Sequence, residues 1–310
     1  MVEPKTKIIS TNSRKNNLNI FSRVNREKGA YFFTLPGNIV LLITAIFPVL
    51  YSFYLSFFNM NVYHFSNFSF VGLEQYKKVF SQLDVGFFTI LIRTIVWTIV
   101  NLLLQVILAL FLALLLNVKD LKGKGIYRTI LILPWAIPSY ISALIWKGMF
   151  NYDFGVINIA LKSIGLRGVE WLNNPICAFF ACVIVNVWMA TPFMMIVILG
   201  GLQSIDTELY EAAKIDGATP WDSFKNITIP LLKPVMFPAV VLTAFITFKQ
   251  FDIIYLITEG MGGKTDLIIT YAYNTFKTNN YSLSAAFSIV IFLILVGLTI
   301  GNMKFLKEKK

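Results

Sequence analysis

Residues 202–234 read LQSIDTELYEAAKIDGATPWDSFKNITIPLLKP, a polar segment between two stretches that are apolar enough to cross a membrane. The first part has the composition of a short helix. Ser204 or Asp206 can act as its N-cap, because a short polar side chain satisfies the free N–H groups of a first turn. Gly217 stands where such a helix ends in a left-handed residue. We expect one short helix before Gly217.

A second helix is predicted directly after this glycine. Thr219 has the chemistry of an N-cap, and Pro220 suits the first helical position, where no N–H is needed. Asp222 follows the cap by three residues, as in a capping box. The 202–234 loop is therefore predicted to be a compact folded unit and not a flexible tether. On this pattern alone, a structured connection between two helices is an equally good interpretation.

The rest of the composition is that of an integral membrane protein. Hydrophobic residues make up 56% of the 310 positions, charged residues 14%, and the mean hydropathy is +0.68. A soluble protein carries about 25% charged residues. A bilayer core about 30 Å thick needs about 20 helical residues to cross it. We predict an all-α protein with six membrane spans, at about 31–58, 87–116, 127–150, 176–201, 235–258 and 282–304.

The net charge of +11 follows this topology. Eighteen Lys and Arg residues fall in the two tails, the 117–128 loop and the 202–234 loop. Only six fall in the three loops that alternate with these along the chain. By the positive-inside rule, both termini and the 202–234 loop are cytoplasmic. The charge is thus a topology signal that implies contact with membrane lipid and no nucleic-acid partner. We predict a basic N-terminal tail at 1–29, with no cleavable signal peptide, a transmembrane domain at 30–306, and a basic C-terminal tail at 305–310.

Catalytic and metal-binding patterns are missing from the sequence. Cys177 and Cys182 have no histidine nearby, so no metal site is predicted. The stretch from Gly260 to Thr265 resembles a phosphate-binding loop, but Thr258 stands where that pattern needs its first glycine. We also find no chain of intramembrane acids of the kind that proton- or sodium-driven carriers use. The chain is predicted to be no enzyme, to bind no cofactor, and to depend on an outside source of energy.

Polar and aromatic residues gather on single faces of three predicted spans. Pro134 and Pro138 distort the third span, and the freed backbone groups need protein or a water-filled cavity around them. Residues at helical offsets of three, four and seven share one face. The faces picked out in this way are Trp135 and Ser139; Asn186, Met189, Ala190 and Phe193; and Thr243, Ile246, Thr247 and Gln250. A cavity lining and simple hydrogen bonding between helices both explain such faces.

Two more polar features are expected to be structural. Asn101 and Gln105 lie four residues apart in the second span and are predicted to point into the helix bundle. Lys249 and Asp252 lie three residues apart in the fifth span. We favour an ion pair between them over a role in a solute path.

The spacing within the 202–234 loop resembles the EAA loop of ABC importer permeases. That pattern is Glu-Ala-Ala, a glycine four positions later and, after nine residues, Ile-x-Leu-Pro; only Ile229 departs from it, standing for leucine. The resemblance implies the type I ABC importer permease fold, with a transport core at 87–304 and the loop docked on a cytoplasmic ATPase. The residues implied in this coupling are Glu211, Ala212, Ala213, Asp216, Gly217, Pro220, Ile227 and Pro230.

Further segments are similar to the maltose/maltodextrin branch of carbohydrate ABC permeases. They include 127–134, 147–151 and Asn186-x-Trp188. The large outer domain of some members is absent from 59–86. The resemblance implies that sugar binds to the three faces described above, at Trp135, Ser139, Met189, Ala190, Phe193, Thr243, Ile246, Thr247 and Gln250. Changes from the usual residues at Ala190, Phe193, Thr247 and Gln250 make maltose itself uncertain.

The resemblance also implies the partners of the chain. They are a second homologous permease, two copies of an ABC ATPase that binds the ATP, and an extracellular or periplasmic sugar-binding protein. The location implied is the plasma membrane of a bacterium or archaeon. The alternative function is a secondary carrier or channel that moves a small polar solute alone. A membrane enzyme is disfavoured by the absence of a catalytic pattern.

Overall fold

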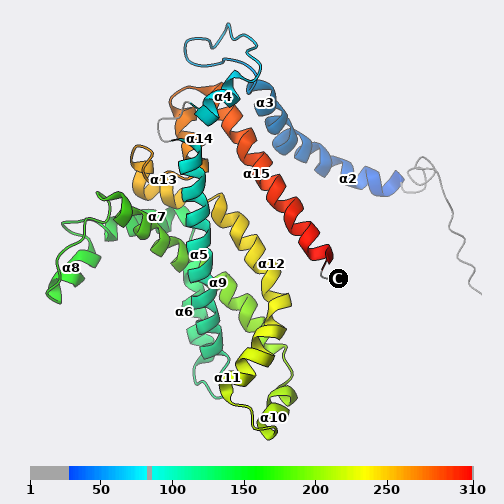
Figure 1. Ribbon diagram of the computed structural model, residues 1–310, viewed down its shortest axis with the longest axis vertical. Coiled ribbons are helices and arrows are strands. Elements are labelled where there is room, and N and C mark those ends of the chain that lie inside the picture. The colour runs from blue at the N-terminus through cyan, green and yellow to red at the C-terminus, as the bar shows by residue number, and fades with distance from the viewer. Residues whose placement is uncertain (1–27, 82–85, 309–310) are drawn as a thin grey trace, which may run out of the picture. The chain divides into compact units, whose positions relative to one another are not determined.

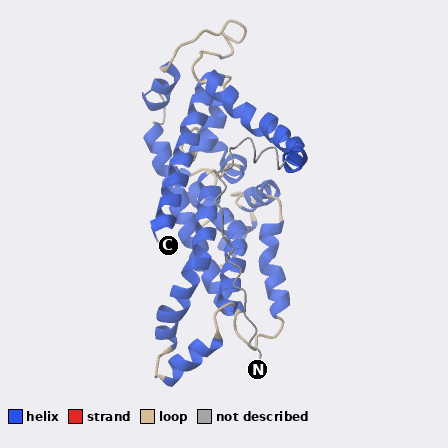
Figure 2. Ribbon diagram, turned by 90° about the vertical axis from the view of Figure 1, so that its right-hand side faces the viewer, coloured by secondary structure: helices blue, strands red, loops and turns tan. Residues whose placement is uncertain are grey.

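The computed structural model describes residues 28–81 and 86–308, and helices form the regular structure of these ranges (Figure 2). The basic tail predicted at 1–29 falls almost wholly outside them. The first of two compact units ends at Tyr51. Its helix α2 (Lys28–Leu41) continues through a π-helical turn, η1 (Leu42–Ile46), into α3 (Phe47–Leu55).

The wide turn of η1 lies directly before Pro48. Proline has no N–H and crowds the carbonyl group four residues earlier. The N–H of Phe47 bonds to the carbonyl oxygen of Leu42, five residues back, so the helix continues with one wider turn. The apolar run Phe32–Leu55 is long enough to cross a membrane, in agreement with the first predicted span.

The second unit, from Ser52 to Lys310, contains all the remaining helices. These are α4 (Glu74–Ser81), α5 (Phe87–Leu116), α6 (Lys124–Ala136), α7 (Ser139–Met149), α8 (Val156–Ser163), α9 (Pro175–Gln203), α10 (Thr207–Ile215), α11 (Pro220–Ser223), η2 (Phe224–Thr228), α12 (Ile229–Phe248), α13 (Asp252–Thr258), η3 (Glu259–Met261), α14 (Ile268–Lys277) and α15 (Tyr281–Glu308). In the described ranges of the whole chain, five helical runs are long and apolar enough to span a membrane, and a bent pair makes a sixth.

The bent pair is α6 and α7, which meet at 94°. The continuous span predicted at 127–150 is therefore wrong in this respect. The residue before a proline is pushed out of the helical region, and Ile137, which precedes Pro138, has the extended angles φ −82° and ψ 132°. The two prolines break the span fully where we expected only distortion.

The fifth predicted span is broken as well. α12 ends at Phe248, and α13 starts at Asp252 after a three-residue gap. Because no continuous helix holds Lys249 and Asp252 three positions apart, the predicted ion pair does not form. Lys249 is exposed, and Asp252 accepts a hydrogen bond from the hydroxyl of Ser139 on α7.

The centre of the second unit is the packing of α5, α9 and α12. Small residues on α5, Ala109 and Ala113, are fully buried and allow the large side chains of α9, such as Met194 and Ile198, to pack closely. In Figure 1 these helices extend from the end that holds α13 and α14 to the end that holds α10 and α11. A separate apolar cluster joins α4, α5, α14 and α15.

The short helices α4 and α8 are amphipathic, and each buries part of one face. Helix α14 was not predicted. Its apolar residues, including Ile268 and Ala272, are buried against α5 and α15, and this long-range packing has no signal in the local sequence.

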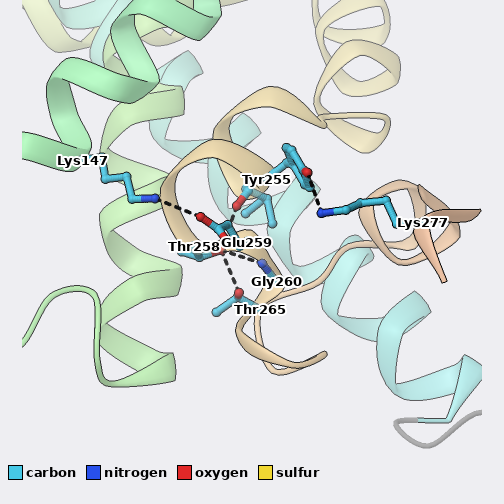
Figure 3. Close-up of polar contacts among 8 residues, drawn as sticks. Lys147, Tyr255, Thr258, Glu259, Gly260, Thr265 and Lys277 are labelled. Atoms are coloured by element: carbon cyan, nitrogen blue, oxygen red, sulfur yellow. Dashed lines mark hydrogen bonds and ion pairs between the residues drawn. The ribbon is translucent and has the colours of Figure 1, made fainter. Parts of the chain in front are cut away.

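The glycine-rich segment after α13 is a packed structural turn (Figure 3). The hydroxyl groups of Thr258 and Thr265 are hydrogen-bonded at 2.8 Å across it. Arg93 of α5 donates to the carbonyl oxygens of Gly263, at 2.6 Å, and Asp266, at 3.0 Å. Burial raises the pKa of the Asp266 carboxyl. Arg93 binds carbonyl oxygens here, an arrangement unlike the phosphate-binding loops in which N–H groups point at an anion.

Gly260 is the residue of this turn that cannot be replaced. Its φ is +77°, and an added Cβ would lie 2.3 Å from Oδ1 of Asp266. Gly262 has φ +61° but open space around its Cβ position.

We predict that Gly260→Ala destabilises the folded protein more than Gly262→Ala does. Both substitutions carry the left-handed strain of about 1–2 kcal/mol, and only the first also displaces Asp266. Thermal unfolding of the detergent-solubilised protein measures the difference. Equal losses of stability for the two variants would contradict the packing described for Asp266.

Candidate functional site

A cavity of about 520 Å³ lies where α6, α7, α9, α12 and α13 meet. All nine residues predicted to bind a solute line it: Trp135, Ser139, Met189, Ala190, Phe193, Thr243, Ile246, Thr247 and Gln250. The structure thus brings together three faces of which the first and the last are more than 100 residues apart in the sequence. Their role in binding stays a prediction.

The break between α6 and α7 positions the first two of these residues. Trp135 lies in the last turn of α6 and Ser139 begins α7. The ring of Trp135 lies 6.2 Å from that of Phe193, centroid to centroid, at an interplanar angle of 30°. Trp135 and Ile246 are each about half exposed, at 55% and 49%. Aromatic and apolar faces at the cavity therefore remain accessible.

Four residues line the cavity that the prediction did not include: Asn186, Leu242, Asp252 and Ile253. Asn186 was on the predicted face of α9. Asp252 had been assigned to an ion pair with Lys249, and only the break after α12 turns it toward Ser139. The cluster of polar residues Lys249, Gln250 and Asp252 at the end of an apolar run is the available signal.

The polar groups behind the cavity form a chain of hydrogen bonds. Nδ2 of Asn186 on α9 donates to Oδ1 of Asn101 on α5, at 2.7 Å. Nδ2 of Asn101 donates to the carbonyl oxygen of Trp97, at 2.8 Å. The indole N–H of Trp97 donates to the carbonyl oxygen of Thr247 on α12, at 3.0 Å. Three helices are joined in this way, and the prediction that Asn101 and Gln105 point into the bundle is confirmed, since both are fully buried.

Three buried polar side chains in the described part of the chain have no hydrogen-bond partner: Gln105, Ser142 and Thr243. A buried polar group without a partner costs about 1–3 kcal/mol. Thr243 lines the cavity, but its hydroxyl oxygen is itself fully buried, so a solute in the cavity does not reach it in this structure.

A second cavity, of about 640 Å³, is lined by α5, α6 and α9. Only Trp188 and Thr191 bring polar side-chain atoms to it. The hydroxyl of Thr191 already donates to the carbonyl oxygen of Val187, at 2.6 Å. This larger cavity therefore suits apolar matter and offers little to a polar solute.

The 202–234 loop has the predicted helix–glycine–helix form. Of the two candidate caps, Asp206 is the one that acts: it accepts a hydrogen bond from the N–H of Glu208 at 3.0 Å. After α10, the N–H of Ala218 bonds to the carbonyl oxygen of Ala213, and that of Gly217 to the carbonyl oxygen of Lys214. This pair of bonds is a Schellman motif, which needs a left-handed residue, and Gly217 has φ +83°.

The second helix of the loop starts with a complete capping box. The side chain of Thr219 accepts from the N–H of Asp222, and the carboxylate of Asp222 accepts from the N–H of Thr219. Pro220 is the first residue of α11. From Pro220 the helix continues through η2 into α12 without a break, and η2 is again a wide turn before a proline, here Pro230.

The eight residues predicted to couple to an ATPase all lie in this loop, which forms one end of the bundle (Figure 1). Glu211, Ala212, Asp216, Gly217, Pro220 and Pro230 are exposed, while Ala213 and Ile227 are half-buried. Four large apolar side chains are also exposed here, and the two most exposed are Ile215 at 86% and Trp221 at 69%. The hydroxyl of Tyr210 on α10 is hydrogen-bonded to that of Thr228 on η2, at 2.9 Å. The loop is thus braced internally and presents apolar surface outward.

Comparison with known proteins gives consistent results. The family model described as "binding-protein-dependent transport system inner membrane component" matches residues 105–304. The chain is 41% identical to the trehalose/maltose transport system permease protein MalF of Thermococcus litoralis, over 93% of this chain and 97% of that protein. It is 33% identical to the galactooligosaccharides transport system permease protein GanP of Bacillus subtilis, over 94% of this chain and 73% of that one.

A solved structure has the same fold. A chain of the bacterial alginate ABC transporter, in complex with a periplasmic protein bound to an alginate pentasaccharide, superposes with a TM-score of 0.78. The two chains are 25% identical, and the match covers 91% of this chain and 94% of the other.

The hydrogen bond between Asn101 and Asn186 generates a stability prediction. Asn186→Leu leaves the amide of Asn101 buried without its donor and should cost about 1–3 kcal/mol. The double variant with Asn101→Leu should cost less than the sum of the two single losses. Gln105→Leu is the matched control: it removes an amide that has no partner and should leave stability unchanged or raise it. Additive losses in thermal unfolding would contradict the pairing.

Proposed function

This chain belongs to the family of binding-protein-dependent transport system inner membrane components, and we propose that it is the sugar-conducting membrane subunit of an ATP-driven importer. The relatives named above are permeases of sugar transport systems by their names. The sugar proposed is a neutral di- or oligosaccharide of the trehalose, maltose or maltodextrin type.

The cavity is the observation that carries the proposal of a sugar. A sugar ring has apolar C–H faces and a rim of hydroxyl groups. Trp135 and Phe193 supply aromatic faces on one wall, and Ser139, Asn186 and Gln250 supply donors and acceptors on others. Few, well-placed polar groups in an apolar pocket are typical of small-molecule sites, and a volume of about 520 Å³ lies within the range usual for such sites.

The proposal includes partners that supply what this chain lacks. A second homologous permease completes the translocation path, and two ABC ATPase subunits bind and hydrolyse the ATP, so that the chain itself needs no cofactor. A sugar-binding protein delivers the solute from outside. Both termini and the 202–234 loop face the cytoplasm, as the distribution of Lys and Arg favours.

The 202–234 loop is proposed as the element that receives the movement of the ATPase. Its exposed Ile215 and Trp221 have the character of docking residues, and its two capping motifs resist deformation. The loop lies between α9 and α12, the two helices that contribute most of the cavity lining. Movement of the loop as a rigid body therefore reaches both walls of the cavity.

A stand-alone carrier or channel is the second candidate, because a single cavity with polar groups also fits a small polar solute. The two candidates differ in the need for a partner. Proteoliposomes that contain only this chain should move no sugar, whereas vesicles with the assembled complex should import it with ATP. Sugar transport by the chain alone would contradict the proposed function.

The coupling role predicts a specific effect of Gly217→Val. A β-branched residue cannot adopt φ +83° without strain, so the turn should rearrange while the membrane helices stay intact. We expect ATP-driven uptake to fall at least about tenfold, an effect of about 1.4 kcal/mol or more on coupling, with unchanged amounts of membrane-inserted protein.

Gly123→Val is the matched control for this experiment. Gly123 also has a positive φ, +74°, and lies before α6 in a different loop. Both variants carry the same kind of backbone strain, but only Gly217 is part of the 202–234 loop. If uptake were the same in the two variants, the conformation of the 202–234 loop would have no special effect on uptake. That result would contradict the coupling role of Gly217.

A panel of sugars tests the substrate class. ATP hydrolysis by the reconstituted complex should rise when the binding protein is loaded with trehalose, maltose or maltotriose, because loaded binding protein favours the state in which the ATPase subunits close. An amino acid of similar size is the control. Stimulation by the amino acid and by none of the sugars would contradict the sugar assignment.

A further inference from the structure

One carboxylate belongs to the lining of the cavity. Asp252 is the first residue of α13, and its carboxylate accepts a hydrogen bond from the hydroxyl of Ser139, the first residue of α7. In the described part of the chain, no Lys, Arg or His lines the cavity. The nearest basic residue along the chain, Lys249, is exposed and outside the lining.

Two contacts hold this carboxylate in place. Helices α7 and α13 pack together through Ala143, Ile253, Ile254 and Ile257. Ser139 and Asp252 join the starts of the two helices, and the ion pair between Lys147 and Glu259, at 3.3 Å, joins their ends (Figure 3). The helices therefore run in the same direction, and the hydrogen bond from Ser139 holds the carboxylate of Asp252 at the cavity.

Other polar groups of the lining can act together with Asp252. Gln250 lies two residues before Asp252, in the gap between α12 and α13, and also lines the cavity. A carboxylate accepts strong hydrogen bonds from hydroxyl groups, so a neutral polyhydroxy solute can donate to Asp252 and bond to the side-chain amide of Gln250.

We propose that Asp252 is a substrate-binding residue that selects neutral sugars over anionic ones. The proposal rests on the function proposed above and specifies the class of sugar. A uronate or other acidic sugar would place its carboxylate in the same cavity as Asp252, without a cation in the lining to balance the two charges. Like charges brought together at a desolvated site oppose binding strongly.

The alginate transporter provides a contrast in the charge of the substrate. Alginate is an acidic polysaccharide, and a chain of its transporter shares the fold of this one. By the function proposed above, the same fold serves an acidic polysaccharide there and a neutral sugar here. A charged residue in the lining is the simplest physical means of setting that choice.

The test measures direct sugar binding to the purified complex without its binding protein, so that the selectivity of that protein does not enter. The probes are maltose and the same disaccharide with its non-reducing glucose replaced by glucuronate, compared by equilibrium dialysis at one ionic strength. We expect the wild-type complex to bind maltose at least about tenfold more tightly than the acidic probe.

Asp252→Asn is the informative variant. The amide oxygen of asparagine can still accept from Ser139, so the link between α7 and α13 is kept while the charge is removed. The ratio of the two affinities should shrink at least about tenfold. The control is Glu259→Gln, which keeps the charge of Asp252, lies outside the cavity lining and breaks the ion pair at the other end of the helix pair. It should keep the wild-type preference for maltose.

Three outcomes would overturn the proposal. One is a wild-type complex that binds both probes equally, a result that needs no variant to fold. The second is an unchanged ratio in Asp252→Asn, and the third is an equal loss of preference in Glu259→Gln, which would make the packing of α7 on α13, and not the charge of Asp252, the cause of the preference. If the complex imports sugar but gives any of these results, only the role of Asp252 is refuted, and the proposed function stands. A complex that binds no sugar and imports none refutes the proposed function with it.

Discussion

The chain of hydrogen bonds from Asn186 through Asn101 and Trp97 to Thr247 is the interaction on which the second unit depends. In an apolar surrounding, helices gain little from burying apolar side chains against each other, and polar contacts between them gain weight. These bonds join α9, α5 and α12 at one level. They also fix the rotation of each helix about its axis, and so decide which side chains of α9 and α12 face the cavity.

The cavity lies where two helices are interrupted. At Ile137 and Pro138, and again at 249–251, the regular backbone bonding stops. Free backbone groups at such breaks must find partners within the protein or face a polar cavity. The carbonyl oxygen of Thr247, in the last turn of α12, bonds to Trp97. Side chains next to the breaks, Ser139 and Asp252 among them, bond to each other at the cavity. The breaks therefore supply polar groups at a depth where a continuous helix would present only its side chains.

Local chemistry explains how much could be predicted from the sequence. The caps and the turn of the 202–234 loop follow from contacts within a few residues of each other, and Asp206, Gly217 and Thr219 all act as predicted. Helical offsets likewise placed Met189, Ala190 and Phe193 on one face. Tertiary context decided the features that were missed. These features are the full break at Ile137, the turn of Asp252 toward Ser139, and helix α14. They depend on packing between segments far apart in the chain, which the periodicity of the sequence does not reveal.

Continuity of helix α12 with the 202–234 loop links the two parts of the proposed mechanism. From Pro220 to Phe248 the backbone is helical, with a single wide turn at η2. A helix resists compression along its axis, so this continuous backbone gives displacement of α11 a path to Thr243 and Thr247. α9 meets the loop from the other side and ends at Gln203, only a few residues before α10. The hydrogen bond between Tyr210 on α10 and Thr228 on η2 connects the two halves of the loop. A loop braced in this manner can rotate two walls of the cavity together, whereas a flexible loop would leave each wall to move alone.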